Sequence, residues 1–363
     1  MGAGGAYVLS VLAKRQYRLS PLGVGNGEDV ALTEEVVVAD DAPELLIADT
    51  DLYAFKPTTD IVVRGTAYPP RACQEFEVCV RVASSAKRVA VLGRRRILRN
   101  GSFSEAAPTE PTTLGYGLAF GGEDSAFLRQ AGHPMAAFQQ GLAERPELLA
   151  SNPFAYPRNP CGKGFSMTGS ADGLADGADE LPQFEDPDDR LTPQRRSAGP
   201  DFVWAGQPIP AGLGWFGLLW FPRCVFFGMV PDVPDPHLAL EAKRGVIELV
   251  TLEQGAQFCT PDVRNACGAS PGLSVPWLVG GETLLLENLS AKAPKLEVPI
   301  PKGPTRMRID GRKGKLIDVE PVLSTVLIEP DADSLTLVWR GTGSALRSYS
   351  DEELEHMPFE VSW

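Results

Sequence analysis

The chain has 363 residues, including 37 glycines and 32 prolines, and carries a formal net charge of −13 at pH 7. A chain of this length can bury a large core and is long for one domain, so we expect two or three lobes. Its negative field repels a phosphate backbone, which argues against nucleic acid as a partner.

The first hundred residues show the patterns of β-strands. Apolar side chains at every second position of the segment 74–82 predict a strand with one buried face. The residues on that face are Phe76, Val78, Val80 and Val82. The segment 88–98 is predicted to pair with it, and further strands are predicted within 7–19, 34–39 and 51–68. Residues 1–105 are therefore expected to form an N-terminal antiparallel β lobe.

Residues 106–205 are predicted to be an insertion rich in loops and helix. Glycines at positions 115, 117, 121 and 122 have a spacing that fits neither a dinucleotide-binding nor a phosphate-binding motif. A helix is predicted at 138–150, before a long Gly/Pro/Asp-rich loop at 152–189 that is acidic after Asp172. Loops of this length inside a compact domain are uncommon and usually functional, lid-forming or disordered.

Residues 206–363 are predicted to form a C-terminal β lobe. Strands are expected at 245–252, 283–289 and 295–300, and hairpins at 305–319 and 322–340. Ser350 and Glu353 have the spacing of a capping box, which predicts a short helix. The predicted fold is mainly β with a few short helices, its antiparallel sheets forming sandwich or barrel-like lobes within one integrated domain.

The most apolar run of the chain is 212–230. Pro222 and Arg223 interrupt it centrally, so we interpret it as two buried strands around a turn and not as a membrane span. The first six residues are small and lack the charged and apolar regions of a signal peptide. We therefore expect a cytoplasmic protein that is not integral to a membrane.

No known catalytic or metal-binding motif occurs in the sequence. The 6 cysteines and 3 histidines show no zinc-ligand spacing, so the cysteines are interpreted as buried free thiols, and we expect no catalytic residue, metal or cofactor. The acidic loop leaves three interpretations open, which are a solvated loop, a site for a hard cation, and an acid–base pair for glycoside cleavage. Its candidate carboxylates are Asp172, Asp176, Asp179, Glu185, Asp186, Asp188 and Asp189.

Three further features have two interpretations each. Lys163 lies between two glycines, which either expose amides for an anion or only permit a tight turn. The basic runs 87–99 and 302–315 alternate with apolar residues, which favours solvated strand faces over a binding patch. A dense aromatic set could form core or, in part, an interface; its members are Trp204, Trp215, Phe216, Trp220, Phe221, Phe226 and Phe227.

Six short motifs follow one another along residues 7–340. They are DLYAFKPTTDIVVRGTAY, GYGLAFGG, NPCGKGF, LPQFEDP, GETLLLENL and VLIEPDADSLTLVWRG. In this order they resemble the bacterial family called domain of unknown function 2169. The resemblance implies that the matching residues shape the fold or its loop, and it assigns none of them catalysis; they are Lys56, Asp60, Gly65, Ala67, Asn159, Gly162, Gly164, Phe165, Glu185, Asp186 and Pro187.

The resemblance implies a non-enzymatic adaptor or chaperone. Such a protein would bind a type VI secretion effector and help to load it onto the VgrG and PAAR spike proteins. The run 212–230 is more apolar than the corresponding family segment, which suggests a partner-specific contact through Trp215, Phe216, Trp220, Phe221, Phe226 and Phe227. The alternative is a carbohydrate-binding protein or carboxylate-dependent hydrolase that uses the acidic loop at 172–189.

Overall fold

The computed structural model describes residues 7–20, 23–39, 42–53, 56–124, 155–167, 169, 180–197, 204–226, 248–251, 257–260, 266–312 and 314–363. Within these residues the chain is mainly β, as the sequence predicts. Its helices are short; they are the α-helices α3 (Arg223–Phe226) and α5 (Asp351–Glu355) and the 3-10 turns η1 (Tyr116–Leu118), η3 (Pro193–Arg195) and η4 (Trp204–Gly206).

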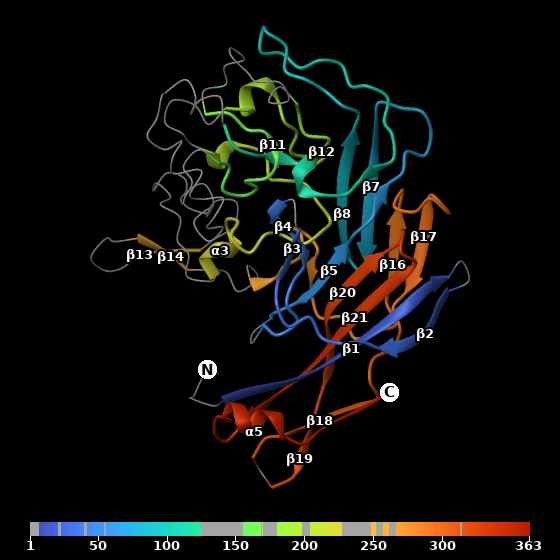
Figure 1. The fold of residues 1–363 in the computed structure, drawn as a ribbon, viewed down its shortest axis with the longest axis vertical. Coiled ribbons are helices and arrows are strands. Elements are labelled where there is room, and N and C mark those ends of the chain that lie inside the picture. Colours follow the sequence, from blue (N-terminus) through green and yellow to red (C-terminus); the bar gives the residue numbers. More distant parts are fainter. Residues whose placement is uncertain are drawn as a thin grey trace.

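The first large sheet joins strands from both ends of the chain (Figure 1). It has six strands in the order β15 (Ser274–Val275), β5 (Thr59–Val63), β20 (Pro321–Glu329), β21 (Ser334–Ala345), β1 (Tyr7–Ser20) and β2 (Gly23–Asp29). All neighbours are antiparallel except β5 and β20, which run parallel. The N-terminal strand β1 therefore lies against β21, from the pair Tyr7–Ala345 to the pair Arg18–Ser334.

The second large sheet is antiparallel throughout and has five strands. Their order is β12 (Phe184–Glu185), β8 (Ser85–Leu92), β7 (Glu75–Val82), β16 (Thr283–Glu287) and β17 (Lys295–Pro299). The alternation predicted for β7 is confirmed, because Phe76, Val78, Val80 and Val82 are all buried. Cys79 lies on the opposite face in this alternation, yet it is also buried; it pairs with Glu287 of β16.

Smaller sheets complete the fold. A three-stranded sheet of β19 (Leu316–Val319), β18 (Arg306–Asp310) and β22 (Phe359–Ser362) lies with α5 at the lower end of the molecule in Figure 1. Ser350 caps α5, and the predicted capping box with Glu353 is present. The two-stranded pairs are β3 (Val37–Ala39) with β4 (Ala42–Ala48), β6 (Thr66–Ala67) with β9 (Thr112–Thr113), β10 (Phe120–Gly121) with β11 (Lys163–Gly164), and β13 (Glu248–Thr251) with β14 (Gln257–Thr260).

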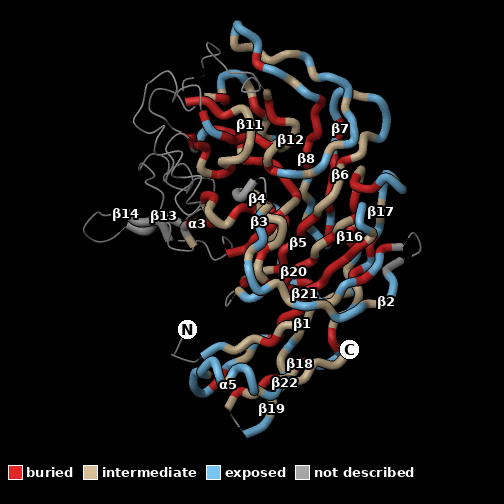
Figure 2. Tube along the Cα trace, viewed as in Figure 1, coloured by how far each residue is buried: buried red, intermediate tan, exposed pale blue. Residues whose placement is uncertain are grey.

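One hydrophobic core serves both large sheets. Its continuous cluster includes Val326 and Trp339 of the first sheet and Val80 and Leu286 of the second, and all four side chains are buried. Figure 2 shows buried segments along the strands of both sheets. Residues 1–105 and 206–363 contribute strands to both sheets and to this core. The two predicted β lobes are thus interleaved in space. Neither large sheet closes into a barrel.

Two local expectations differ from the structure. The part of the run 212–230 that the structure describes consists of turns followed by α3, not of two strands, because Gly and Pro at four of its positions favour turns over a ladder. The strand predicted at 88–98 ends at Leu92, since the next residues bridge two other segments. The helix predicted at 138–150 lies outside the described residues.

Among the residues described, no helix combines the length and the apolar character needed to cross a bilayer.

We predict that a fragment of residues 1–105 does not fold alone. Strands β1, β5 and β7 would lose β21, β20 and β16, which leaves unpaired backbone groups and an uncovered apolar face. An amide proton–nitrogen correlation spectrum of the fragment should lack dispersion, with the full chain as control. A dispersed spectrum together with a cooperative thermal transition would contradict the interleaved architecture.

Candidate functional site

Three of the motifs that are distant in sequence meet beside the second sheet. The segment GYGLAFGG provides β10, NPCGKGF provides β11, and LPQFEDP provides β12. Phe120 pairs with Lys163 in parallel, Ala119 bridges to Phe184, and the amide of Gln183 donates to the carbonyl of Leu118 at 2.8 Å. We call this assembly the motif junction; β11 and β12 mark it in Figure 1.

Asn159 ties the junction together. Its side chain is fully buried, and Nδ2 donates to the carbonyl oxygens of Tyr116 at 2.9 Å and Phe120 at 3.0 Å. The thiol of Cys161 donates to Oδ1 of Asn159 at 3.0 Å. The amide therefore gives both carbonyl groups a partner, and the carbonyl of Tyr116 also accepts from the amide of Ala119 at 3.0 Å. Asn159 holds the chain in shape and faces no open surface.

Glycines permit the close approach of these segments. A Cβ atom on Gly162 would lie 2.5 Å from Nδ2 of Asn159 and 2.6 Å from the carbonyl oxygen of Ala119. Gly164 has φ +91°, a conformation that favours glycine, and Phe165 after it is buried. The glycines around Lys163 thus serve packing and a turn, which is one of the two interpretations that the sequence left open.

The acidic residues of LPQFEDP are paired with basic side chains. Glu185 is buried on β12 and accepts a hydrogen bond from Nη2 of Arg95, while Nη1 of Arg190 lies 3.7 Å from its second oxygen. Asp186 pairs with Lys87 at 3.3 Å. Pro187 lies between Asp186 and the exposed Asp188. Its carbonyl oxygen accepts a hydrogen bond from Nε of Arg190 at 3.4 Å. These contacts fasten the motif to β8 and its extension.

The remaining described carboxylates of the loop are paired as well. Asp188 lies 2.7 Å from Nη2 of Arg88, and Asp189 lies 2.7 Å from Nη1 of Arg195. Within the described residues no group of His, Cys, Asp and Glu has a geometry that could hold a metal ion. Asp172, Asp176 and Asp179 lie outside the described residues.

The segment KPTTDIVVRGTA (residues 56–67) of the first motif contributes a buried ion pair to the first sheet. Nζ of Lys56 lies 3.0 Å from Oδ2 of Asp60 and donates to Oγ1 of Thr325 at 2.8 Å. Asp60 also accepts from the amide of Gly268 at 2.8 Å and from the hydroxyl of Ser274 at 3.0 Å. The two side chains are only 5% and 1% exposed, so the pair links β5 to its neighbours and is closed to solvent.

The other two residues of this motif also serve the fold. Gly65 has φ +151°, and its carbonyl oxygen accepts from the amide of Leu114 at 2.8 Å. Ala67 is fully buried in the core cluster. Cys267, near Asp60, is buried too, and this burial together with the Asp60 charge raises the pKa of its thiol to about 11. Cys267 therefore stays a neutral thiol at physiological pH, which is unlike a cysteine nucleophile.

The aromatic run is core where the structure describes it. Trp215, Phe216, Trp220 and Phe221 are all buried, and Phe216 meets Trp220 edge to face with ring centroids 5.2 Å apart. Arg223 is buried beneath them, where it pairs with Asp49 and donates to the carbonyl of Phe216 at 2.7 Å. These four rings present no surface to a partner, which corrects the expectation of a contact there.

The two remaining members of the proposed contact have different positions. Phe226, in α3, is half-buried, and Phe227 lies outside the described residues. Trp204 is buried and packs against Tyr156 and Phe221, with ring centroids 6.2 Å and 5.3 Å away.

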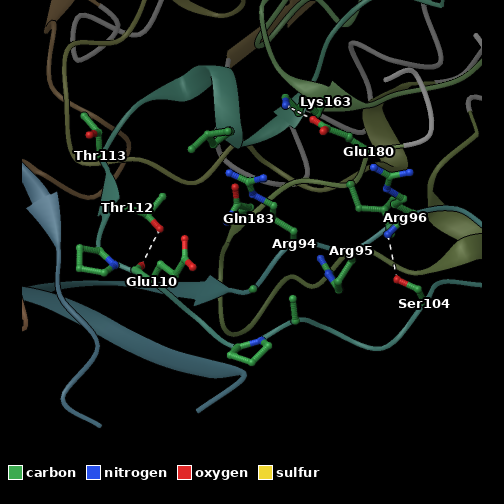
Figure 3. A pocket seen from close by; sticks show the side chains of 16 residues that line it. Arg94, Arg95, Arg96, Ser104, Glu110, Thr112, Thr113, Lys163, Glu180 and Gln183 are labelled. Atoms are coloured by element: carbon green, nitrogen blue, oxygen red, sulfur yellow. Dashed lines mark hydrogen bonds and ion pairs between the residues drawn. The ribbon is translucent and has the colours of Figure 1, made fainter. Parts of the chain in front are cut away.

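A surface groove of about 860 Å³ lies beside the motif junction. Its floor is the segment Arg94–Arg96, which extends β8 past Leu92. The two flanks are residues 104–113, and Lys163 with residues 180–183. Figure 3 shows the three arginines rising from one segment, with Lys163, Glu180 and Gln183 along one side. We call this feature the arginine groove.

Hydrogen bonds on both edges fix the backbone of the groove floor. The amide of Ala107 donates to the carbonyl of Arg94 at 3.1 Å, and the amide of Arg96 donates to Oγ of Ser104 at 2.9 Å. On the other edge the amide of Leu181 donates to the carbonyl of Arg95 at 3.1 Å. An extended backbone alternates its side chains, so Arg95 turns inward to Glu185 whereas Arg94 and Arg96 are exposed.

The charges of the groove are mixed, with an excess of cations. Glu180 binds Lys163, and this hydrogen bond, together with the nearby guanidinium groups of Arg94 and Arg96, lowers the pKa of the Glu180 carboxyl. Glu110 is the second carboxylate of the lining. Among the described lining residues are three arginines, one lysine and two glutamates; Arg95 is paired with Glu185 outside the lining, and Lys163 with Glu180.

Sequence reasoning found the basic run 87–99 but assigned it to a solvated strand face. In the structure Lys87 and Arg95 are each 11% exposed at the side chain and bind the carboxylates of LPQFEDP. The signal that could have identified them is the opposite charge of two runs almost a hundred residues apart. No local pattern reports such a pairing, because it depends on which strands become neighbours.

Comparison with known proteins gives one family. The family described as "Uncharacterized protein conserved in bacteria (DUF2169)" matches residues 4–340. No curated protein and no solved structure matches the chain.

Replacement of Asp60 by Asn should destabilise the protein by about 3–5 kcal/mol, because it leaves the Lys56 ammonium group buried without a counter-charge. Chemical denaturation monitored by tryptophan fluorescence measures the loss. The control is Asp318→Asn, which removes an exposed partner of Arg306 and should leave the midpoint unchanged. A single Asp60→Asn variant as stable as the parent would show that the buried pair does not contribute as described.

Replacement of Gly162 by Ala should destabilise the motif junction by about 1–3 kcal/mol or more, because the new Cβ would overlap Asn159 and Ala119. The matched control is Gly115→Ala in the same region, where a Cβ meets nothing within 4 Å. Thermal melting of the two variants side by side tests the difference. Equal melting temperatures would mean that the junction has room that the described packing lacks.

Proposed function

This chain belongs to the bacterial family DUF2169, and we propose that it is a non-enzymatic adaptor or chaperone for a type VI secretion effector. In this role it would bind the effector in the cytoplasm and help to load it onto the VgrG and PAAR spike proteins. The proposal follows the function that the six-motif resemblance implies. Contacts within the chain support it, because they show how the motif residues are used.

The contacts of the motif residues support the view that the motifs stabilise the fold. Asn159, Asp60 and Glu185 are buried, and each is engaged by backbone or side-chain groups of the same chain. None of these three side chains presents an unengaged acid, base or nucleophile to solvent. A conserved scaffold that positions a variable binding surface is what an adaptor requires.

The observation that carries the proposal is the arginine groove. It is open, it has the size of a ligand site, and one of its flanks contains Lys163 of NPCGKGF together with Leu181 and Gln183 of LPQFEDP. Exposed arginines are enriched where proteins bind one another, since a guanidinium group makes several directed hydrogen bonds and loses little on desolvation. The described aromatic run is buried, so the groove is the better candidate for partner contact.

The proposal predicts a stable complex with a secretion component. The tagged chain is co-expressed with the products of its neighbouring genes and recovered from the lysate. One partner should co-elute in a fixed ratio, and its soluble yield should fall when this chain is omitted. If the neighbours encode soluble secretion proteins and the chain elutes alone, the adaptor function is refuted.

A further inference from the structure

We propose that the arginine groove binds an extended acidic peptide segment, with Arg94 and Arg96 as the residues that contact its carboxylates. The inference rests on the proposed adaptor function, because the segment would belong to the partner that the chain carries. It goes further in assigning the surface and the chemistry of the ligand.

Hydrogen bonds fix the backbone of the groove floor at Arg94–Arg96. Ser104 and Ala107 bond to the floor on one edge and Leu181 on the other, so the three arginine Cα atoms are fixed in an extended geometry. Arg95 is anchored further, because Nη2 donates to the carbonyl of Pro182 at 3.0 Å and to Glu185. A preorganised backbone lowers the entropy that binding must overcome.

Arg94 and Arg96 are placed to meet a carboxylate. Both residues are exposed, both line the groove, and Arg94 makes no ion pair with any residue that the structure describes. They lie two positions apart on an extended segment, and therefore on the same face of it. A guanidinium group binds a carboxylate through two parallel hydrogen bonds, so this pair fits an acidic side chain or two such side chains in sequence.

The flanks offer complementary groups to a peptide backbone. Glu110, Glu180 and Oγ1 of Thr112 are acceptors for peptide N–H groups. Gln183 donates one N–H to the carbonyl of Leu92, and its other N–H and its side-chain oxygen can still donate and accept. Pro108 and Pro111 supply an apolar wall without further N–H groups. A peptide has both donors and acceptors along its length, so it can use the mixed lining better than a ligand that only accepts.

The same lining disfavours a nucleic acid. Phosphate oxygens cannot donate to Glu110 or Glu180, and these two carboxylates would repel a chain of phosphates. The overall charge of −13 adds long-range repulsion. An acidic peptide meets the same long-range repulsion, but its N–H groups can donate to these glutamates while its carboxylates lie at Arg94 and Arg96.

The test uses a fluorescein-labelled octaglutamate peptide and the full chain, with binding followed by fluorescence anisotropy. The parent protein should bind it saturably, and the affinity should fall as salt is raised. The double variant Arg94→Glu, Arg96→Glu should bind at least about ten-fold more weakly, because two attractive contacts become repulsive. The matched control Arg71→Glu, Arg99→Glu makes the same change in net charge at exposed positions outside the groove lining, and it should bind like the parent.

Each result decides the proposal. Absence of saturable binding to the parent, an equal loss in the control, or preferential binding of labelled octathymidylate over the peptide would overturn it. Thermal melting checks that both double variants are folded. If a secretion partner co-purifies equally with the parent and with the variant Arg94→Glu, Arg96→Glu, the proposal that the groove binds the partner is refuted, whereas the adaptor function is supported. Peptide binding without any co-purifying partner would support the groove and refute the adaptor.

Discussion

The buried contact between Arg95 and Glu185 is the interaction on which the candidate site depends. It joins the extension of β8 to β12, the short strand at the edge of the second sheet. With Arg95 directed inward, the alternation of an extended chain directs Arg94 and Arg96 outward. The same contact fastens LPQFEDP to the groove floor, while the bridge between Ala119 and Phe184 joins this motif to GYGLAFGG in the motif junction. A buried charge needs such a partner, which makes the arrangement sensitive to either residue.

The fold distributes its strands so that the two chain ends support each other. β1 lies between β21 and β2, while β5 lies between β20 and β15, and the second sheet likewise joins β7 to β16. A single core fills the space between these sheets. The buried pairs Lys56–Asp60 and Arg223–Asp49 add directed contacts at the margin of that core. Such pairs help to specify which segments meet, because the helices among the described residues are short.

Much of the strand pattern could be predicted from the sequence, because alternation and turn residues are local signals. The strands β7, β16 and β17 and the hairpin β20–β21 lie where apolar periodicity placed them. The pairing of β1 with β21 could not be predicted, since it depends on contacts more than three hundred residues apart. The prediction of two strands within 212–230 was wrong for a different reason. Its hydrophobicity predicted burial, and Trp215, Phe216, Trp220 and Phe221 are buried, but hydrophobicity does not distinguish turns from strands.

The candidate site was predictable only in part. The motif residues were identified as shaping the fold, and the contacts of Asn159 and Glu185 agree with that role. The binding surface was sought in the aromatic run because exposed and buried aromatic residues have the same sequence pattern. Arg94 and Arg96 belong to a basic run whose inward and outward members look identical in sequence. Only the position of Glu185 on β12 separates them.

The most direct test of the account places a photo-crosslinker in the groove of the working protein. Thr113 lines the groove and is exposed, so p-benzoylphenylalanine at that position can report a bound segment without removing an arginine. In cells that also produce the neighbouring secretion proteins, irradiation should link Thr113→p-benzoylphenylalanine to one partner, at a site rich in Asp or Glu. The same probe at exposed Arg71, outside the lining, should give no such product. Crosslinks at Arg71 but none at Thr113 would show that partners bind elsewhere and would contradict the account.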